Sequence, residues 1–112
     1  MFDYANFNGD ISNWDVSNVT NMEAMFRHSE FNGNIGDWEV FNVTNMKYMF
    51  KASMFNGDIS KWNVYHVEDM KYMFRDTHFN KDISNWDVTN VFDKEDIFWG
   101  CPIKEEYKPK FK

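Results

Sequence analysis

A 24-residue period runs through the chain and limits what it can fold into. Tryptophan recurs at this spacing, at Trp14, Trp38, Trp62 and Trp86. Phenylalanine followed by asparagine recurs with it, at Phe7-Asn8, Phe31-Asn32, Phe55-Asn56 and Phe79-Asn80. A unit this short cannot bury its own apolar face, so we expect successive units to stack on one another. The tryptophan, phenylalanine and methionine columns would then form one continuous core, which explains the aromatic content of 20%.

The apolar spacing changes within each unit. In the first unit, Trp14 and Val16 alternate with polar residues and favour a short strand over residues 11–16. From Val19 onward the spacing is helical and predicts a short helix over residues 18–28. The predicted fold class is therefore an α/β repeat solenoid, in which every 24-residue unit supplies a short parallel strand and a short helix.

The period divides the chain into two regions. Four repeats span residues 1–96, with boundaries at 1–24, 25–48, 49–72 and 73–96. Residues 97–112 form a divergent partial repeat, a C-terminal cap and a basic tail. We expect Phe98, Trp99 and Ile103 to fold over the last layer, because the apolar end of a stack needs a cap.

The repeat resembles that of a known family. The spacing Ile11-x-x-Trp14-x-Val16 is similar to the Leu-x-x-Leu-x-Leu core of leucine-rich repeats, with tryptophan in the second position. The longer unit, Phe-Asn-Gly-Asp-Ile-Ser-Asn-Trp-Asp-Val-Ser-Asn-Val-Thr-Asn-Met, resembles the repeat of BspA-like leucine-rich-repeat surface proteins. The same repeat occurs in mycoplasma-type lipoproteins as a domain of unknown function.

This resemblance extends over about residues 1–98 and implies a right-handed, leucine-rich-repeat-like solenoid. By family habit it also implies an interaction module at the cell surface or secreted. The first residues, Met1-Phe2-Asp3-Tyr4, match neither a signal peptide nor a lipobox. The family has no catalytic motif that could be transferred to this chain.

Composition argues against several functions. Eighteen acidic and twelve basic residues give a net charge of −6, which disfavours general binding to nucleic acid. No apolar run approaches the roughly 20 residues that span a bilayer, so we expect no membrane insertion. His28, His66 and His78 occupy different phases of the repeat, so stacking does not gather them into a site. With no nucleophile or phosphate-binding motif either, we expect neither an enzyme nor a cofactor.

Two polar columns have structural interpretations. We expect a ladder that satisfies backbone groups in the turns from Asn8, Asn32, Asn56 and Asn80. A second column supplies oxygen atoms of the kind that calcium prefers: Asp10, Asn34, Asp58 and Asp82. Those side chains can instead bond to nearby backbone N–H groups. The loop lacks the Gly-Gly-x-Gly-x-Asp pattern of calcium-binding solenoids, so we favour the structural role.

The repeats disagree most in one outward-facing row, which consists of Ser17, Phe41, Tyr65 and Thr89. The outer units have hydroxyl residues suited to capping a helix, whereas the central units have aromatic residues. His66 follows Tyr65 where the other units have asparagine. We therefore predict a partner-docking patch with seven members: Phe41, Tyr65, His66, Asp37, Glu39, Lys61 and Asn63. The alternative is sequence drift, with Phe41 and Tyr65 packing against each other over a groove.

The predicted function is non-catalytic binding of a protein partner. The alternative is a structural or assembly subunit, or a spacer, that self-associates through the ends of the solenoid. The N-terminal residues begin in the middle of a unit without a dedicated cap, and an exposed end favours such association.

Overall fold

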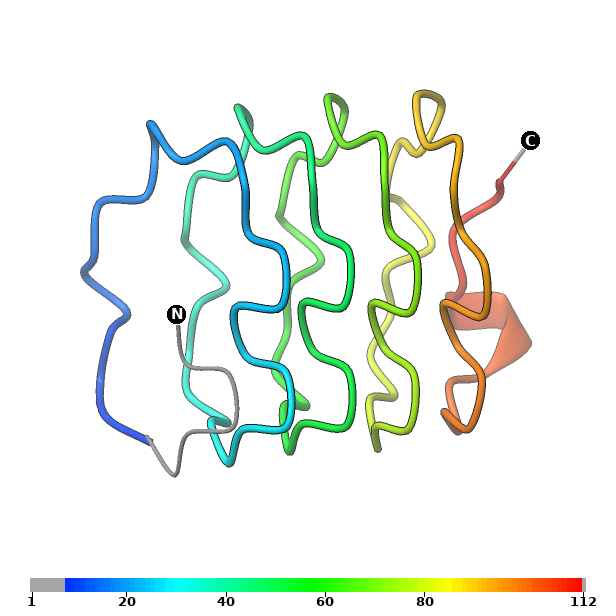
Figure 1. Cartoon of the computed structure of the whole chain (residues 1–112), viewed down its shortest axis with the longest axis horizontal. Helices are drawn as coiled ribbons and strands as arrows, with labels where there is room; N and C mark the ends of the chain where they lie inside the picture. Colours follow the sequence, from blue (N-terminus) through cyan, green and yellow to red (C-terminus); the bar gives the residue numbers. More distant parts are fainter. Residues whose placement is uncertain (1–7, 112) are drawn as a thin grey trace.

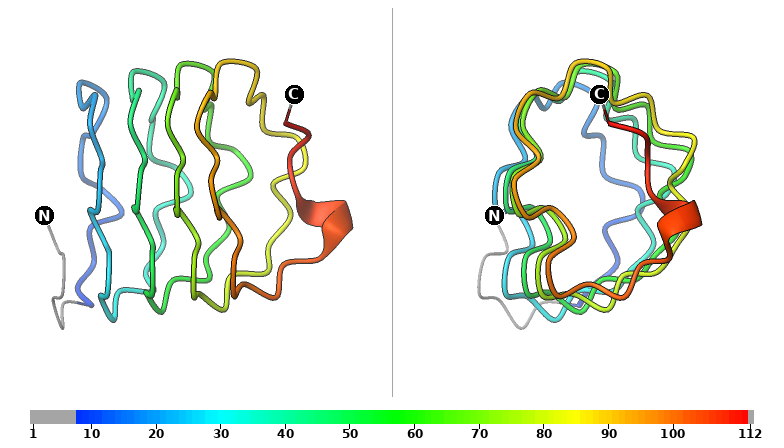
Figure 2. Two further views of the ribbon diagram at one scale, coloured as in Figure 1. Left: turned by 45° about the vertical axis from the view of Figure 1, so that its right-hand side comes forward. Right: turned by 90° about the vertical axis from the view of Figure 1, so that its right-hand side faces the viewer.

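In the computed structural model, which describes residues 8–111, the chain winds in successive coils that lie side by side along the long axis (Figure 1). Seen from the end, the coils superpose on one another (Figure 2). The overall dimensions are 35 × 30 × 19 Å. Among the described residues, the only helix is the 3-10 helix η1 (Glu105–Tyr107). Extended pairing there is limited to isolated parallel bridges, which join Asn21 to Asn45, Asn45 to Asp69, and Asp69 to Asp93.

The expected α/β repeat solenoid is therefore wrong for this chain. Residues 11–16 do not form a strand in a sheet, and residues 18–28 do not form a helix. Turns and bends replace both elements in each coil. The physical reason differs between the two segments. Residues 18–28 use N–H groups for hydrogen bonds between coils, whereas N–H groups in and next to residues 11–16 donate to side-chain carboxylates.

Residues 22–29 form consecutive turns in place of the predicted helix. The N–H groups of Met25 and Ser29 donate to carbonyls three residues back. Ala24 and His28 have φ angles of 57° and 56°, in the left-handed region that a right-handed helix excludes. A turn that repeats every four residues buries Met22, Met25, Phe26 and Ser29. Over so short a segment, this burial pattern is the same as that of one helix face.

Alternate N–H groups of these turns join neighbouring coils. In the first junction, four of them donate to carbonyls 23 residues further on, at 2.8 to 2.9 Å: Met22, Ala24, Phe26 and His28. Equivalent rows join the second coil to the third and the third to the fourth. A helix would direct the same N–H groups to carbonyls four residues back in its own turn. Helix formation and this ladder between coils therefore exclude one another.

Over residues 11–16, side chains and a turn take up the hydrogen bonds that a strand would use. The N–H of Trp14 donates to the carbonyl of Ile11 at 3.1 Å and closes a turn. The carboxylates of Asp10 and Asp15 each accept an N–H from two residues further on. Aspartate competes with regular backbone pairing in this way, which explains why the alternating apolar pattern does not produce a strand.

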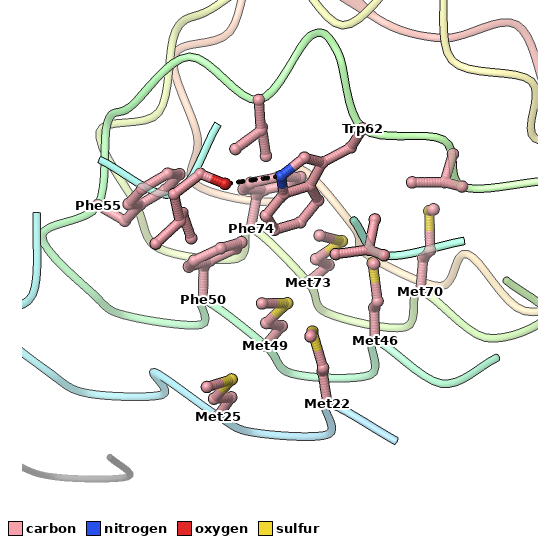
Figure 3. Close-up of a cluster of buried hydrophobic side chains, with 14 of the residues drawn as sticks. Met22, Met25, Met46, Met49, Phe50, Phe55, Trp62, Met70, Met73 and Phe74 are labelled. Carbon is pink, nitrogen blue, oxygen red and sulfur yellow. Dashed lines mark hydrogen bonds between the residues drawn. The ribbon is translucent and has the colours of Figure 1, made fainter. Parts of the chain in front are cut away.

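Stacked side chains fill the interior, as the sequence predicts (Figure 3). Trp38, Trp62 and Trp86 are at most 4% exposed, whereas Trp14 is 42% exposed at one end of its column. One phenylalanine column has ring centroids 5.6 to 5.7 Å apart along Phe26, Phe50, Phe74 and Phe98. The indole Nε1 of Trp62 donates to the carbonyl of Ile35 at 2.9 Å. Met1, Phe2 and Phe7 of the predicted columns lie outside the described residues.

The C-terminal segment follows the last coil. Ile103 is buried, Phe98 stacks on Phe74, and the N–H of Ile83 donates to the carbonyl of Tyr107 at 3.0 Å. Trp99 is 56% exposed, and its ring lies 4.5 Å from the guanidinium of Arg75 in the preceding coil. From residue 8 to residue 111, no helix is long and apolar enough to cross a membrane.

Candidate functional site

Phe41 and Tyr65 lie on the surface, with exposed fractions of 47% and 43%. The ring of His66 contacts both rings edge-on, at centroid distances of 4.6 Å from Phe41 and 5.2 Å from Tyr65. The three side chains therefore form one exposed aromatic cluster. Ser17 and Thr89, at the equivalent positions of the outer coils, donate their hydroxyl groups to Asp15 and Asp87 two residues earlier, rather than capping a helix.

His66 interrupts a column of hydrogen bonds between coils. The side-chain amides of Asn42 and Asn90, at the equivalent position, donate to carbonyls of the preceding coil at 2.8 Å. In the same register, His66 would donate to the carbonyl of Phe41, but none of the described residues donates to that carbonyl. The imidazole contacts the aromatic rings instead, which leaves the Phe41 carbonyl available to an incoming group.

A groove of about 330 Å³ lies beside this cluster. Its lining includes five of the seven predicted site residues: Asp37, Glu39, Phe41, Lys61 and Asn63. Tyr65 and His66 do not line the groove, but the ring of His66 contacts both Tyr65 and Phe41, which does line it. The structure thus brings together residues from two neighbouring coils that were grouped on sequence phase alone.

The carboxylates of Asp37 and Glu39 have no hydrogen bond or ion pair within residues 8–111, and both side chains are exposed. Glu39 is the exception in its column. Asp15 and Asn63, at the same phase, each accept an N–H from two residues further on, which the longer glutamate does not do. The groove therefore has two carboxylates available to a partner, beside an exposed aromatic ring.

The column of side chains considered above as a possible calcium site has a structural role. The side chains of Asp10, Asn34, Asp58 and Asp82 each accept the N–H of the residue two positions later. Hydrogen bonds from the side chain and then the backbone of Ser12 hold the pKa of Asp10 below its usual value. Ser84 lowers the pKa of Asp82 in the same way. In the part of the chain that the structure describes, no group of three His, Cys, Asp or Glu residues could hold a metal ion.

The predicted asparagine ladder is confirmed. Each side-chain oxygen accepts the N–H of the residue 24 positions later, at 2.8 to 3.1 Å, along Asn8, Asn32, Asn56 and Asn80. A polar groove of about 570 Å³ runs over part of this ladder. Several of its lining groups, such as the side-chain oxygens of Asn32 and Asp58, already bind backbone N–H groups. It is therefore a weaker candidate for ligand binding than the groove beside Phe41.

The sequence prediction missed a surface cluster of lysine and tyrosine side chains on the turns that join neighbouring coils. Lys47 lies over the ring of Tyr48 at 5.6 Å, and Lys71 lies over that of Tyr72 at 5.1 Å. The two tyrosine rings lie 5.2 Å apart. Their signal in the sequence is a Lys-Tyr pair that recurs after 24 residues. The predicted helix gave no reason to expect the two pairs to lie on one surface.

Comparison with known proteins places the chain in a family. The family described as "Mycoplasma protein of unknown function, DUF285" matches residues 1–109. This chain belongs to the DUF285 family. No curated protein and no solved structure matches it. The description of DUF285 names no activity, so the role of the aromatic cluster in this DUF285 chain has to be argued from its own geometry.

Proposed function

We propose that this DUF285 chain is a non-catalytic protein-interaction module, in the manner of the BspA-like surface proteins that its repeats resemble, and displayed at the cell surface or secreted as they are. A partner docks over Phe41, Tyr65 and His66. The observation that supports this proposal is the exposure of two aromatic rings at 47% and 43% in the central coils, beside a groove. Exposed aromatic rings within a polar rim have the composition of interface hot spots.

The charges around the groove indicate the chemistry of the partner. Asp37 and Glu39 are exposed and have no cationic neighbour within ion-pair distance among the described residues. The partner segment therefore presents Lys or Arg next to an apolar side chain, which contacts Phe41. The charges raise the association rate and the specificity, and the buried ring contacts supply most of the affinity.

The experiment uses the full chain and a display library of random peptides as the probe. We expect the selected peptides to contain Lys or Arg beside an aromatic or aliphatic residue. Their dissociation constants are then measured by calorimetry for the parent chain and for the double variant Phe41→Ser, Tyr65→Ser. We expect the double variant to bind at least about tenfold more weakly, which corresponds to about 1.4 kcal/mol.

Phe92→Thr is the matched control. Phe92 is 76% exposed and lies outside the groove, and threonine is the residue at the same phase in the first two coils, Thr20 and Thr44. We expect this control to bind the selected peptides as tightly as the parent chain. Equal binding by the parent chain and the double variant would overturn the proposal, provided that both show the same thermal unfolding.

A further inference from the structure

The turns at residues 23–28, 47–52 and 71–76 concentrate positive charge on one surface of an acidic chain. They contain five of its twelve basic residues, although the net charge of the chain is −6: Arg27, Lys47, Lys51, Lys71 and Arg75. Hydrogen bonds between the coils hold these turns side by side. The N–H of His28 donates to the carbonyl of Lys51 at 2.8 Å, and the next junction has an equivalent bond to the carbonyl of Arg75. Basic residues from separate repeats therefore share one surface.

Each of the two tyrosine rings on this surface has two cations over it. Arg27 and Lys47 lie 5.7 and 5.6 Å from the ring centroid of Tyr48. A lysine and an arginine of the next coil lie over Tyr72 in the same way, at 5.1 and 5.0 Å. Cations at this distance occupy the π surface of a ring, so neither ring is free to stack on a base or a sugar. The hydroxyl groups of both tyrosines form no hydrogen bond within residues 8–111 and remain available as donors.

Two lysines of this surface are available for a new ion pair. The side chains of Lys47 and Lys51 form no ion pair or hydrogen bond in the part of the chain that the structure describes. The cations of the next coil have carboxylate partners, such as Glu95 at 3.3 Å from Lys71. The turn at residues 47–52 therefore carries the positive charge that the chain itself does not neutralise.

Acidic residues lie on both sides of this basic surface along the stack. Glu23 in the first coil and Glu95 in the fourth occupy the phase of Lys47 and Lys71. Between them, the turns at 47–52 and 71–76 hold four basic residues and one acidic residue, a local net charge of +3. A long polyanion that followed the stack would meet repelling carboxylates at each end of this segment. The charge pattern therefore favours a short acidic ligand.

We propose that the turns at 47–52 and 71–76 bind a short acidic peptide segment of a protein partner. Carboxylates of the segment pair with Lys47 and Lys51 and accept hydrogen bonds from the hydroxyl groups of Tyr48 and Tyr72. A single surface ion pair contributes little, so the affinity depends on the several cations that stacking brings together. Contact with the Tyr48 ring already restricts the Lys47 side chain, which lowers the entropy lost on binding. This surface is separate from the aromatic cluster around Phe41 and does not depend on it.

The first test uses the full chain and a synthetic peptide with a short block of glutamates flanked by glycine and serine. The same peptide with glutamine in place of glutamate is the control probe. Calorimetry at low ionic strength measures both dissociation constants. We expect the glutamate peptide to bind at least about tenfold more tightly than the glutamine peptide. Its binding should weaken as salt is added, because salt screens ion pairs at the surface.

Lys47→Glu reverses the charge at the centre of the surface and introduces the residue that the first and fourth coils have, Glu23 and Glu95. We expect this variant to bind the glutamate peptide at least about tenfold more weakly than the parent chain. Lys81→Glu is the matched control, because it makes the same change in net charge at an exposed residue outside these turns. It should bind like the parent chain. If Lys47→Glu does not fold, Lys51→Gln gives the second reading and should also weaken binding.

Three results would each overturn the proposal. They are equal affinities of the parent chain for the glutamate and glutamine peptides, equal affinities of the folded turn variant and Lys81→Glu for the glutamate peptide, and tighter binding of the parent chain to a single-stranded oligonucleotide or a sulfated oligosaccharide of the same charge. The double variant Phe41→Ser, Tyr65→Ser should bind the glutamate peptide like the parent chain. Lys47→Glu should likewise keep its affinity for the basic peptides selected at the aromatic cluster, so the two proposals can fail separately.

Discussion

Replacing Trp62 with phenylalanine tests how the tryptophan column joins one coil to the next. Trp62 is 3% exposed, and its Nε1 donates to the carbonyl of Ile35 at 2.9 Å (Figure 3). Its ring lies parallel to that of Trp86, with centroids 6.4 Å apart. Phenylalanine keeps an aromatic ring in the stack and removes the N–H. The variant therefore separates the hydrogen bond from most of the ring packing.

The expected cost follows from the partners of the Ile35 carbonyl. That oxygen also accepts the backbone N–H of Trp38 at 3.2 Å, so it does not become fully unpaired. The lost hydrogen bond then costs about 1 kcal/mol, at the low end of the range for a buried group. The smaller ring leaves apolar space that costs roughly another 1 kcal/mol. We expect Trp62→Phe to lower the free energy of unfolding by about 2 kcal/mol.

Urea unfolding, followed by circular dichroism and by the fluorescence of the remaining tryptophans, measures this change. Trp99→Phe is the matched control, because Trp99 is 56% exposed and its side chain donates no hydrogen bond to residues 8–111. We expect the control to change the free energy of unfolding by less than about 0.5 kcal/mol. If the two variants unfold at the same urea concentration with equal slopes, the side-chain bond between coils does not stabilise the stack.

Two further predictions concern the turns. Because Ser84 holds the pKa of Asp82 below its usual value, this carboxylate stabilises the fold above about pH 3.9, the pKa in the unfolded chain, and the contribution disappears as the pH falls through the folded pKa. Asp82→Asn should keep the turn, as Asn34 does at the same phase, and reduce the loss of unfolding free energy measured between about pH 5 and pH 2; an unchanged pH profile would contradict this. Ala52→Gly should leave the melting temperature unchanged or raise it, because relief of a φ of 57° offsets the added chain entropy. A loss of about 1 kcal/mol, typical of glycine inside a helix, would refute the left-handed turn.

The core was predictable because burial follows the period directly. Each repeated apolar residue meets its own copy in the next coil, so the phase of Trp38 or Phe50 is enough to place it inside. The backbone was not predictable in the same way. The apolar spacing of residues 22–29 suits a helix and a four-residue turn equally well. The choice depends on whether the N–H of Ala24 bonds within its own coil or to Lys47 of the next.

The candidate site shows the same division. Phase alone grouped Phe41, Glu39 and Lys61, and the structure lines one groove with all three. Phase could not show that His66 contacts both exposed rings, or that Glu39 fails to accept the N–H that Asn63 accepts in its coil. Those facts depend on the length of the Glu39 side chain and on the missing hydrogen bond from His66 to the preceding coil. A single repeat contains only one of the two coils that such a bond joins.

By itself, the sequence determined which columns of side chains form the core, that the units stack with a 24-residue period, and where the repeats differ on the surface. Only the tertiary structure decided that the backbone forms turns in place of strands and helices. The physical reason is that a turn such as Met22–Met25 leaves alternate N–H groups without a local acceptor, and the neighbouring coil supplies the carbonyls that they need. The same requirement leaves the N–H groups of Lys94, Asp96 and Phe98 without an acceptor among residues 8–111.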